Sequence, residues 1–303
     1  MTDIILHHFD PSPFAEKVRL ALGIKGLAWK SVQIPMIMPK PLLMPLTGGY
    51  RKTPVMQFGA DIYADSNLIM RELDRRFPQT SLFPNGEAAL SAALANWSDV
   101  SFFQPGAGLS MGMNPDLPEP LLKDRKAFFK FMDFDGLEDA IPHLYSQFLA
   151  QIDLVEQQFE DGRSYVAGEL VGALDILNYF PVWMARGNFP QVDEWMSQFP
   201  RVLDWEKRMQ QVGHGELQEL PAEQALEIAL VAQPDPTIAV SRNPAGLEAG
   251  QSVAVTPTDY GEDPVYGSLQ VLNNSEVVIQ REAKEVGRVN NHFPRSGFRV
   301  EPC

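Results

Sequence analysis

Cysteine is almost absent from this chain, whose 303 residues include only Cys303. One thiol cannot form an intramolecular disulfide, and such scarcity is typical of proteins in a reducing compartment. Long apolar runs are absent too, since none approaches the roughly 18 residues of a membrane-spanning helix. The polar start Met1-Thr2-Asp3 is unlike a signal peptide. We therefore expect a cytoplasmic protein that does not contact a membrane.

Basic residues are scarce relative to acidic ones. Lys and Arg number 25 against 39 Asp and Glu, which gives a net charge of −14 and an isoelectric point near 4.8. Such a charge repels phosphate backbones, so no nucleic-acid partner is expected. The composition is 45% hydrophobic and 21% charged, as in folded globular proteins, and 33.9 kDa is enough for two or three cores.

The start of the chain predicts a strand, a loop and a helix. The apolar run Ile4-Ile5-Leu6 leads through a loop to Ser12, a favourable N-cap, and Pro13 suits the first helical position. The predicted helix has an apolar face formed by Phe14, Val18, Ala21 and Leu22. A hydroxyl at the open N-terminus of a helix is well placed to meet an anion. The alternative is that Ser12 only caps the helix.

Two further segments extend this pattern. Pro54, in Arg51–Met56, stands directly before an apolar strand, at a position where a cis X–Pro bond often makes a tight turn. Residues 62–69 run from a short strand into a helix that opens with Asp65 and Ser66. In chain order, these segments predict β–α–β and then β–β–α within about 80 residues.

The motifs S-P-F-x-x-K-V-R-L-A-L, K-T-P-V and A-D-S-x-x-I, in this order, resemble the glutathione-binding N-terminal domain of the glutathione S-transferase family. The serine before Pro-Phe most resembles tau-like members, whereas omega-like members have cysteine at the position of Ser12. The resemblance covers about the first 215 residues. It implies a thioredoxin-like domain at 1–80 and an all-helical domain at 88–213.

The resemblance implies glutathione as co-substrate and Ser12 as the catalytic residue, which would donate a hydrogen bond to the glutathione sulfur. Lowering the thiol pKa by two units from about 8.5 requires roughly 2.7 kcal/mol of differential interaction. A hydrogen bond to a charged group supplies roughly 1.5–3 kcal/mol and a helix N-terminus roughly 0.3–1 kcal/mol. No separate general base is needed, and no metal is expected.

The same resemblance assigns the glutathione-binding positions, which are Lys40, Thr53, Pro54, Asp65 and Ser66. Asp65 and Ser66 match the residues that receive the γ-glutamyl group, through the carboxylate and the helix N-terminus. The backbone of Thr53, before the presumed cis Pro54, would pair with the cysteinyl unit. Lys40, and more weakly Lys52, would approach the glycine carboxylate.

The second substrate would be a small apolar electrophile. Candidate walls are Phe14, Phe102, Phe103, Met111 and Met113. Plain core packing is the alternative for these side chains. Helices are predicted at 88–100, 121–132, 137–159, 173–186, 192–199 and 201–212, whereas the glycines at 106, 108 and 112 indicate an interrupted stretch.

A motif in the second domain, Gly168–Ile176, resembles the family's G-D-x-x-(S/T)-x-A-D-I. In the family, the Ser or Thr caps a buried helix and the Asp three residues later bonds back to it. Gly172 replaces the hydroxyl residue in this chain, and glycine is a tolerated N-cap. We expect Asp175 to be a folding residue rather than a catalytic one.

Beyond the resemblance, residues 214–245 predict a helix at 221–232 and a Pro-rich linker. Residues 246–303 alternate with period two and predict a small antiparallel, barrel-like β domain of about five strands, separable from glutathione binding. This segment has five basic and eight acidic residues, which disfavours nucleic-acid binding. Its segment 290–297 is interpreted as a structural turn, with a recognition loop as the alternative.

The predicted function is that of a glutathione S-transferase. Alternatives are a glutathione-dependent isomerase, dehalogenase or peroxidase on the same fold, or a non-catalytic protein that docks a partner through its β domain. The resemblance also implies a homodimer, in which the first domain of one chain contacts the helical domain of the other.

Overall fold

The computed structural model describes residues 3–114 and 116–303. The chain divides into two compact units, each built from separate stretches of sequence. The first unit comprises Met1–Ala15, Ala28–Arg71 and Leu217–Cys303, and the second comprises Glu16–Leu27 and Glu72–Glu216. The C-terminal β segment therefore belongs to the same unit as the N-terminal strands, and not to a unit of its own.

The N-terminal elements form the predicted thioredoxin-like arrangement. They are β1 (Ile5–His8), α1 (Pro13–Ile24), β2 (Ala28–Gln33), α2 (Met44–Thr47), β3 (Val55–Phe58), β4 (Asp61–Ala64) and α3 (Ser66–Arg76). Strand β1 runs parallel to β2 and antiparallel to β3, and β3 pairs antiparallel with β4. Strands β1, β3 and β4 are buried along their whole length, which explains their apolar sequences.

The C-terminal segment contributes five strands, as predicted. They are β7 (Ser252–Pro257), β8 (Val265–Leu272), β9 (Glu276–Ala283), β10 (Gly287–Pro294) and β11 (Phe298–Pro302). They pair antiparallel with one another in the order β11-β7-β8-β9-β10. The short strand β6 (Ala239–Val240) joins β8, and β5 (Glu216–Glu219) extends the other edge beyond β2.

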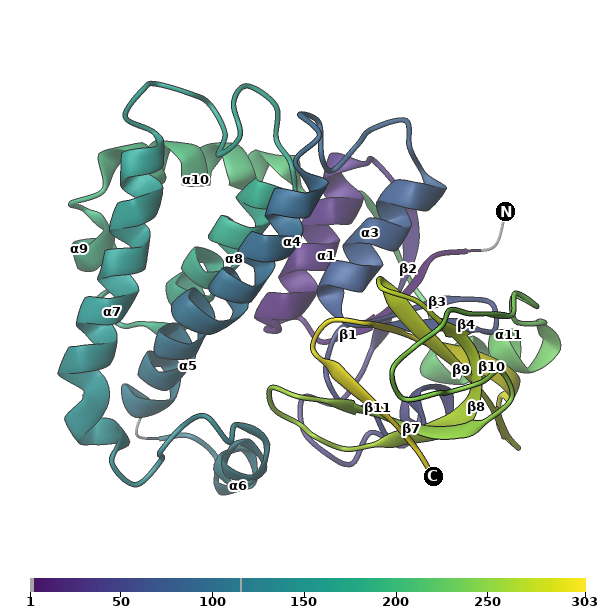
Figure 1. Ribbon diagram of the computed structural model, residues 1–303. Helices are drawn as coiled ribbons and strands as arrows, with labels where there is room; N and C mark the ends of the chain where they lie inside the picture. Colours follow the sequence, from purple (N-terminus) through teal and green to yellow (C-terminus); the bar gives the residue numbers. More distant parts are fainter. Residues whose placement is uncertain (1–2, 115) are drawn as a thin grey trace. The chain divides into compact units, whose positions relative to one another are not determined.

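These strands do not form the separate β domain that the sequence predicts. Strand β10 runs parallel to β4, with Asn290, Asn291 and His292 opposite residues 61–63, so that one 11-stranded sheet contains both ends of the chain (Figure 1). Segment 290–297, interpreted from sequence as a turn, supplies most of this joining strand. The segment was not predicted as a strand because it is rich in polar residues, whereas a strand is predicted from the alternation of apolar and polar residues.

The core of the first unit is shared by its N-terminal and C-terminal parts. Val55 and Ile62 belong to one buried cluster with Val289 and Phe293. Helix α11 (Ala222–Val231) adds two buried alanines to the cluster, and the Gln57 side-chain amide donates to the Ala225 carbonyl at 2.9 Å. Removal of the C-terminal strands would therefore expose apolar surface of the thioredoxin-like part.

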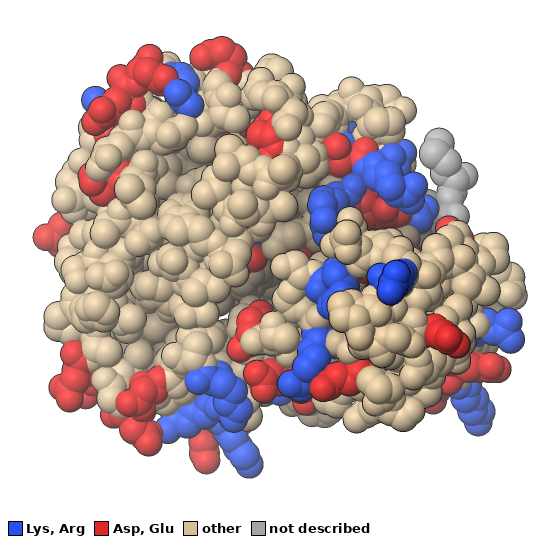
Figure 2. All heavy atoms as spheres, in the orientation of Figure 1, with Lys and Arg blue, Asp and Glu red and all other residues tan. Residues whose placement is uncertain are grey.

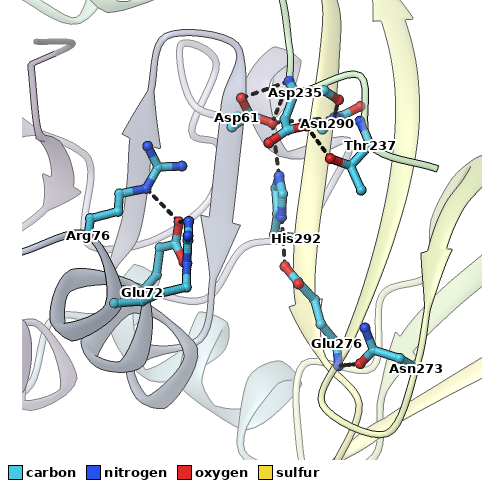
Figure 3. A network of polar contacts seen from close by, with 10 residues as sticks. Asp61, Glu72, Arg76, Asp235, Thr237, Asn273, Glu276, Asn290 and His292 are labelled. Carbon is cyan, nitrogen blue, oxygen red and sulfur yellow. Dashed lines mark hydrogen bonds and ion pairs between the residues drawn. The ribbon is translucent and has the colours of Figure 1, made fainter. Parts of the chain in front are cut away.

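A buried polar network fastens β10 to β4 (Figure 3). His292 lies between two carboxylates, with Nε2 3.0 Å from Asp61 Oδ1 and Nδ1 2.7 Å from Glu276 Oε1. Its ring stacks on Tyr63 at 4.1 Å, and Asn290 Nδ2 donates to Asp61 at 3.3 Å. Burial alone would lower the pKa of His292, but the hydrogen bonds to both carboxylates outweigh it and raise that pKa.

The second unit is all-helical, as expected. Besides residues of α1 and α3, it contains α4 (Ala88–Trp97), α5 (Phe103–Gly112), α6 (Glu119–Phe128), α7 (Leu137–Gln158), α8 (Ala173–Asn188), α9 (Val192–Met196) and α10 (Pro200–Val212). Its core is aromatic, with Phe102 5.2 Å from Phe148 and Tyr179 5.7 Å from Trp205 between ring centroids.

The predicted interruption after residue 100 is wrong, because helical structure continues to Gly112 through a π-helical turn at Ser98–Phe102. The glycines of α5 serve close packing instead of breaking the helix. A Cβ at Gly106 would lie 2.7 Å from Met184 Cε and 3.0 Å from Phe148 Cε2. Only glycine leaves room for these neighbours, so packing overrides local propensity.

Asp175 in α8 has the structural role that the sequence predicts. Its carboxylate accepts hydrogen bonds from the Val166 amide at 2.9 Å, the Gly172 amide at 3.0 Å and the Trp205 indole at 2.9 Å. Gly172 has no space for a side chain, since a Cβ would lie 2.8 Å from the Leu82 carbonyl oxygen. Burial raises the pKa of Asp175 to about 6, against the lowering effect of these donors.

We expect Asp175→Asn to destabilise the fold by about 1–3 kcal/mol, because an amide leaves at least one buried donor without an acceptor. The raised pKa makes ionisation costly in the folded state, so the stability from protonation is full below about pH 3.8 and is lost as pH rises through about 6. Urea unfolding should therefore show a wild-type advantage that is roughly 1 kcal/mol larger at pH 5 than at pH 7.5. A difference in free energy of unfolding between the wild type and Asp175→Asn that does not change with pH would contradict the raised pKa of Asp175.

Candidate functional site

Ser12 is buried at the N-terminus of α1. Its amide donates to the Phe9 carbonyl at 3.1 Å, and its Oγ accepts a hydrogen bond from the Ala15 amide at 3.2 Å. This is the N-cap geometry expected from the sequence. Accepting that bond leaves the hydroxyl proton available for donation. Capping and donation to a ligand sulfur are therefore compatible in one side chain.

The charged residues that follow Ser12 in its motif make ion pairs within the second unit. Lys17 is fully buried, pairs with Asp99 and lies 4.5 Å from the centre of the Phe180 ring. The Arg19 guanidinium pairs with Glu16 at 2.8 Å, and both side chains are nearly inaccessible. Paired charges of this kind are costly to break, so these residues have a structural role.

Lys40 and Thr53 lie together in the first unit. The buried Lys40 ammonium donates to the Thr53 hydroxyl at 3.1 Å and to the Arg51 carbonyl at 3.0 Å. The Thr53-Pro54 peptide bond is cis, as predicted. The backbone of Thr53 stands immediately before β3, where it can pair with an extended peptide ligand.

Asp65 and Ser66 begin helix α3. Asp65 has φ = 77°, in the left-handed region that few residues other than glycine adopt. Its Oδ1 accepts hydrogen bonds from the amides of Asn67 at 2.8 Å and Leu68 at 3.3 Å. Ser66 is buried at the first position of the helix. A held, strained residue at a helix N-terminus is typical of anion-binding sites.

Sequence reasoning missed Tyr50, which is buried beside these residues. Its hydroxyl accepts a hydrogen bond from the backbone amide of Asp65, and its ring lies 5.8 Å from Phe293 and 6.3 Å from Phe298. Burial raises the pKa of Tyr50 well above its ordinary value, and the nearby Asp65 carboxylate adds to the shift. No sequence periodicity marked Tyr50, because it follows two glycines in an irregular segment.

Lys52 contacts the C-terminal segment. It forms an ion pair with Asp259 and lies 4.2 Å from the centre of the Tyr260 ring. The Lys52 side chain is only 12% exposed, whereas that of Asp259 is 49% exposed. Both partners come from the loop between β7 and β8. Asp259, from the C-terminal part of the chain, thus neutralises Lys52, which was the weaker candidate for binding the glycine carboxylate of glutathione.

The proposed second-substrate residues differ in how deeply they are buried. Phe102 and Phe103 are buried in the core of the second unit, Phe103 against Phe129 and Phe180, so core packing explains them. Met111 and Met113 are partly buried at the end of α5, and Phe14 is partly buried in the other unit. Of these candidates, Phe102 and Phe103 are the least suited to meet a substrate.

The second unit contains a cavity of about 640 Å³ that none of these candidates lines. It lies among α4, α7, α8 and segment 163–167, and its lining is mainly apolar, with Leu90, Leu94, Trp97, Leu154 and Leu174. Two of these leucines, Leu90 and Leu154, have exposed fractions of 53% and 52%.

On the face drawn in Figure 2, groups of Lys and Arg side chains and groups of Asp and Glu side chains are separated by uncharged surface. Within residues 3–114 and 116–303, no helix is long and apolar enough to cross a membrane. Over the same residues, no cluster of three or more His, Cys, Asp or Glu side chains is arranged to hold a metal ion.

Comparison with known proteins gives consistent results. The family model for the glutathione S-transferase N-terminal domain matches residues 6–81. Glutathione S-transferase U4 of Arabidopsis thaliana is 22% identical over 218 residues, which are 69% of this chain and 85% of that protein. A rice glutathione S-transferase solved in complex with glutathione covers 74% of this chain and 94% of its own, with TM-score 0.51 and 21% identity.

A GST-like protein from Pseudomonas syringae is similar over the full length of both chains, with TM-score 0.82 and 34% identity. The similarity therefore includes the C-terminal strands, whereas the other two proteins cover 69% and 74% of this chain. The segment that matches the family model contains Ser12, the cis Thr53-Pro54 bond and the start of α3. On these grounds the chain belongs to the glutathione S-transferase family.

Proposed function

We propose that this protein binds glutathione in its first unit and activates the thiol through Ser12 for transfer to a small apolar electrophile. The observation that carries the proposal is the buried Ser12 hydroxyl, which accepts the capping bond from Ala15 and keeps its own proton for a ligand. The rice relative, whose structure contains glutathione, supports the choice of ligand.

Each end of glutathione finds a chemically matched group in this proposal. The γ-glutamyl ammonium meets the Asp65 carboxylate, and its carboxylate meets Ser66 and the N-terminus of α3. The cysteinyl unit pairs with the backbone of Thr53. The glycine carboxylate meets the buried Lys40 ammonium, which is already held by Thr53 and Arg51. Ser12 then donates to the thiolate, with the N-terminus of α1 adding its partial positive charge.

Two measurements test the proposal. Binding of the purified protein to immobilised glutathione should be specific and competed by free glutathione. A panel of electrophiles, followed by loss of free thiol, should then reveal conjugation. Binding without conjugation, but with isomerisation, dehalogenation or peroxide reduction, would favour the other glutathione-dependent reactions. No binding at all would favour a non-catalytic docking protein and would overturn the proposal.

We also propose that the protein is a homodimer, as in the family that its sequence resembles. The edge of β4 is already paired with β10 of the same chain, so two copies would meet through other surfaces. Sedimentation equilibrium should give twice the 33.9 kDa mass of the chain at micromolar concentration. A monomer mass would overturn the dimer without affecting the assignment of the glutathione site.

The Lys52–Asp259 ion pair leads to a prediction with an unusual sign. Asp259→Asn should strengthen glutathione binding about 1.5- to 5-fold at low salt, because it removes a carboxylate that competes with the glycine carboxylate of glutathione for Lys52, the weaker of the two lysine candidates. High salt should reduce the gain. The matched control is Asp263→Asn, which removes the same charge from an exposed position of the same loop. An equal gain in both variants, or none in Asp259→Asn, would contradict the competition.

A further inference from the structure

Two side chains of the C-terminal strands hold the end of helix α2. Asn291 on β10 donates from Nδ2 to the Leu46 carbonyl at 2.8 Å, and Arg281 on β9 donates from Nη1 to the Pro45 carbonyl at 3.2 Å. Arg281 also donates to Asn291 Oδ1 at 3.3 Å, so the two side chains support each other. They satisfy carbonyls that the end of a helix leaves without intrahelical partners.

Helix α2 stands between two parts of the proposed glutathione site. Lys40 precedes it, and the Leu43 and Met44 amides both donate to the Lys40 carbonyl, at 3.0 and 3.1 Å. Tyr50 follows α2 and reaches the Asp65 amide through its hydroxyl. A four-residue helix has little stability of its own, so its position depends on outside contacts.

The C-terminal strands also pack against the Tyr50 ring. Phe293 on β10 and Phe298 on β11 lie within 6.3 Å of it between ring centroids. Tyr50 and both phenylalanines belong to the buried core of the first unit. The C-terminal strands therefore pack Tyr50, which lies beside Asp65, in place.

We infer that Arg281 and Asn291 are positioning residues of the glutathione site, which hold α2 so that Lys40 and Asp65 keep the spacing of a glutathione molecule. This inference rests on the proposed function. It assigns the C-terminal strands a role in ligand affinity, although no residue of theirs is proposed to touch the thiol. A purely structural role would lower stability without a specific change in the use of glutathione.

The test uses full-length Asn291→Ala and Arg281→Lys, because lysine keeps the charge but its ammonium ends one bond short of the position of Arg281 Nη1, which makes the contacts to α2 and to Asn291. Arg288→Ala is the control, since Arg288 is exposed and lies on β10, the strand that contains Asn291. We expect Kd and KM for glutathione to rise about 3- to 10-fold in the two variants, with kcat within about twofold. Hydrogen exchange should become faster at the amides of residues 43–50 and stay unchanged in α7.

Every outcome of this experiment either supports or overturns the positioning role of Arg281 and Asn291. Weaker glutathione binding together with faster exchange at α2 supports the inference. Faster exchange with unchanged Kd and KM overturns it, as does exchange that stays at the wild-type rate. Arg288→Ala must match the wild type, and an equal loss in this control would also overturn the inference. If the wild type itself fails to bind glutathione, the proposed function fails first, and this inference falls with it.

Discussion

A chain that ends at Gln233 is expected not to fold, and therefore not to bind glutathione. The cut removes β10, which pairs with β4, and the apolar partners of Tyr50 and Ile62 in the shared core. Loss of a single large buried side chain costs about 2–5 kcal/mol, and the net stability of a domain is about 5–15 kcal/mol. Removal of β6 to β11 exceeds what the remaining unit can tolerate. This outcome reverses the expectation of a separable β domain.

The experiment compares the truncated chain with one shortened only by Cys303, which is exposed. Circular dichroism and thermal unfolding should show a cooperative transition for the second chain alone. A folded truncated chain that keeps its affinity for immobilised glutathione would contradict the role of the continuous sheet. It would instead restore the separable domain that the sequence indicates.

The second large effect concerns Ser12→Ala. We expect conjugation to fall about 10- to 100-fold, which corresponds to about 1.4–2.7 kcal/mol of lost stabilisation. Glutathione affinity should stay within a few fold, because the contacts proposed for Asp65, Ser66 and Lys40 remain. The loss of the N-cap also costs about 0.5–2 kcal/mol of stability, so activity must be measured well below the unfolding temperature.

A second variant separates capping from catalysis. Ser12→Gly keeps most of the N-cap stability, since glycine at an N-cap costs only a few tenths of a kcal/mol, but it has no hydroxyl. It should conjugate as poorly as Ser12→Ala while unfolding at nearly the wild-type temperature. Ser12→Cys should shift activity from conjugation toward disulfide reduction, because a thiol can form a mixed disulfide with glutathione.

The sequence predicted the elements of the N-terminal part because local signals specify them. Ser12, Pro54 and Asp65 each sit at the end of an element, where caps, turns and helix starts have strong residue preferences. The predicted cis bond and the predicted start of α3 are both present. These features depend on a few residues that are neighbours in the sequence, so short sequence motifs are enough to predict them.

The sequence could not predict how β10 joins the sheet or why Tyr50 is buried. Asn290, Asn291 and His292 resemble turn residues because they are polar. In the structure they can be buried in a strand because Asp61, Leu46 and other residues distant in the sequence supply their hydrogen-bond partners. Hydrogen bonds between residues that are distant in the sequence produce no periodic pattern of apolar residues. Nothing in the sequence alone distinguishes a polar strand of this kind from a loop.

The glycines of α5 were misread for a related reason. Gly106 would break an isolated helix, but a tight contact with Phe148 and Met184 selects it in this one. Phe102 and Phe103 were candidates for a substrate wall and are core residues, since apolar spacing alone does not separate the two roles.

The most direct test of the central claim is the thiol pKa of bound glutathione, followed by thiolate absorbance against pH. With the wild-type protein in excess over glutathione, the midpoint should lie about two units below the free value of about 8.5. With Ser12→Ala, it should return most of the way to that value. If the two proteins titrate at the same pH, Ser12 is only a helix cap, and the account of thiol activation is wrong.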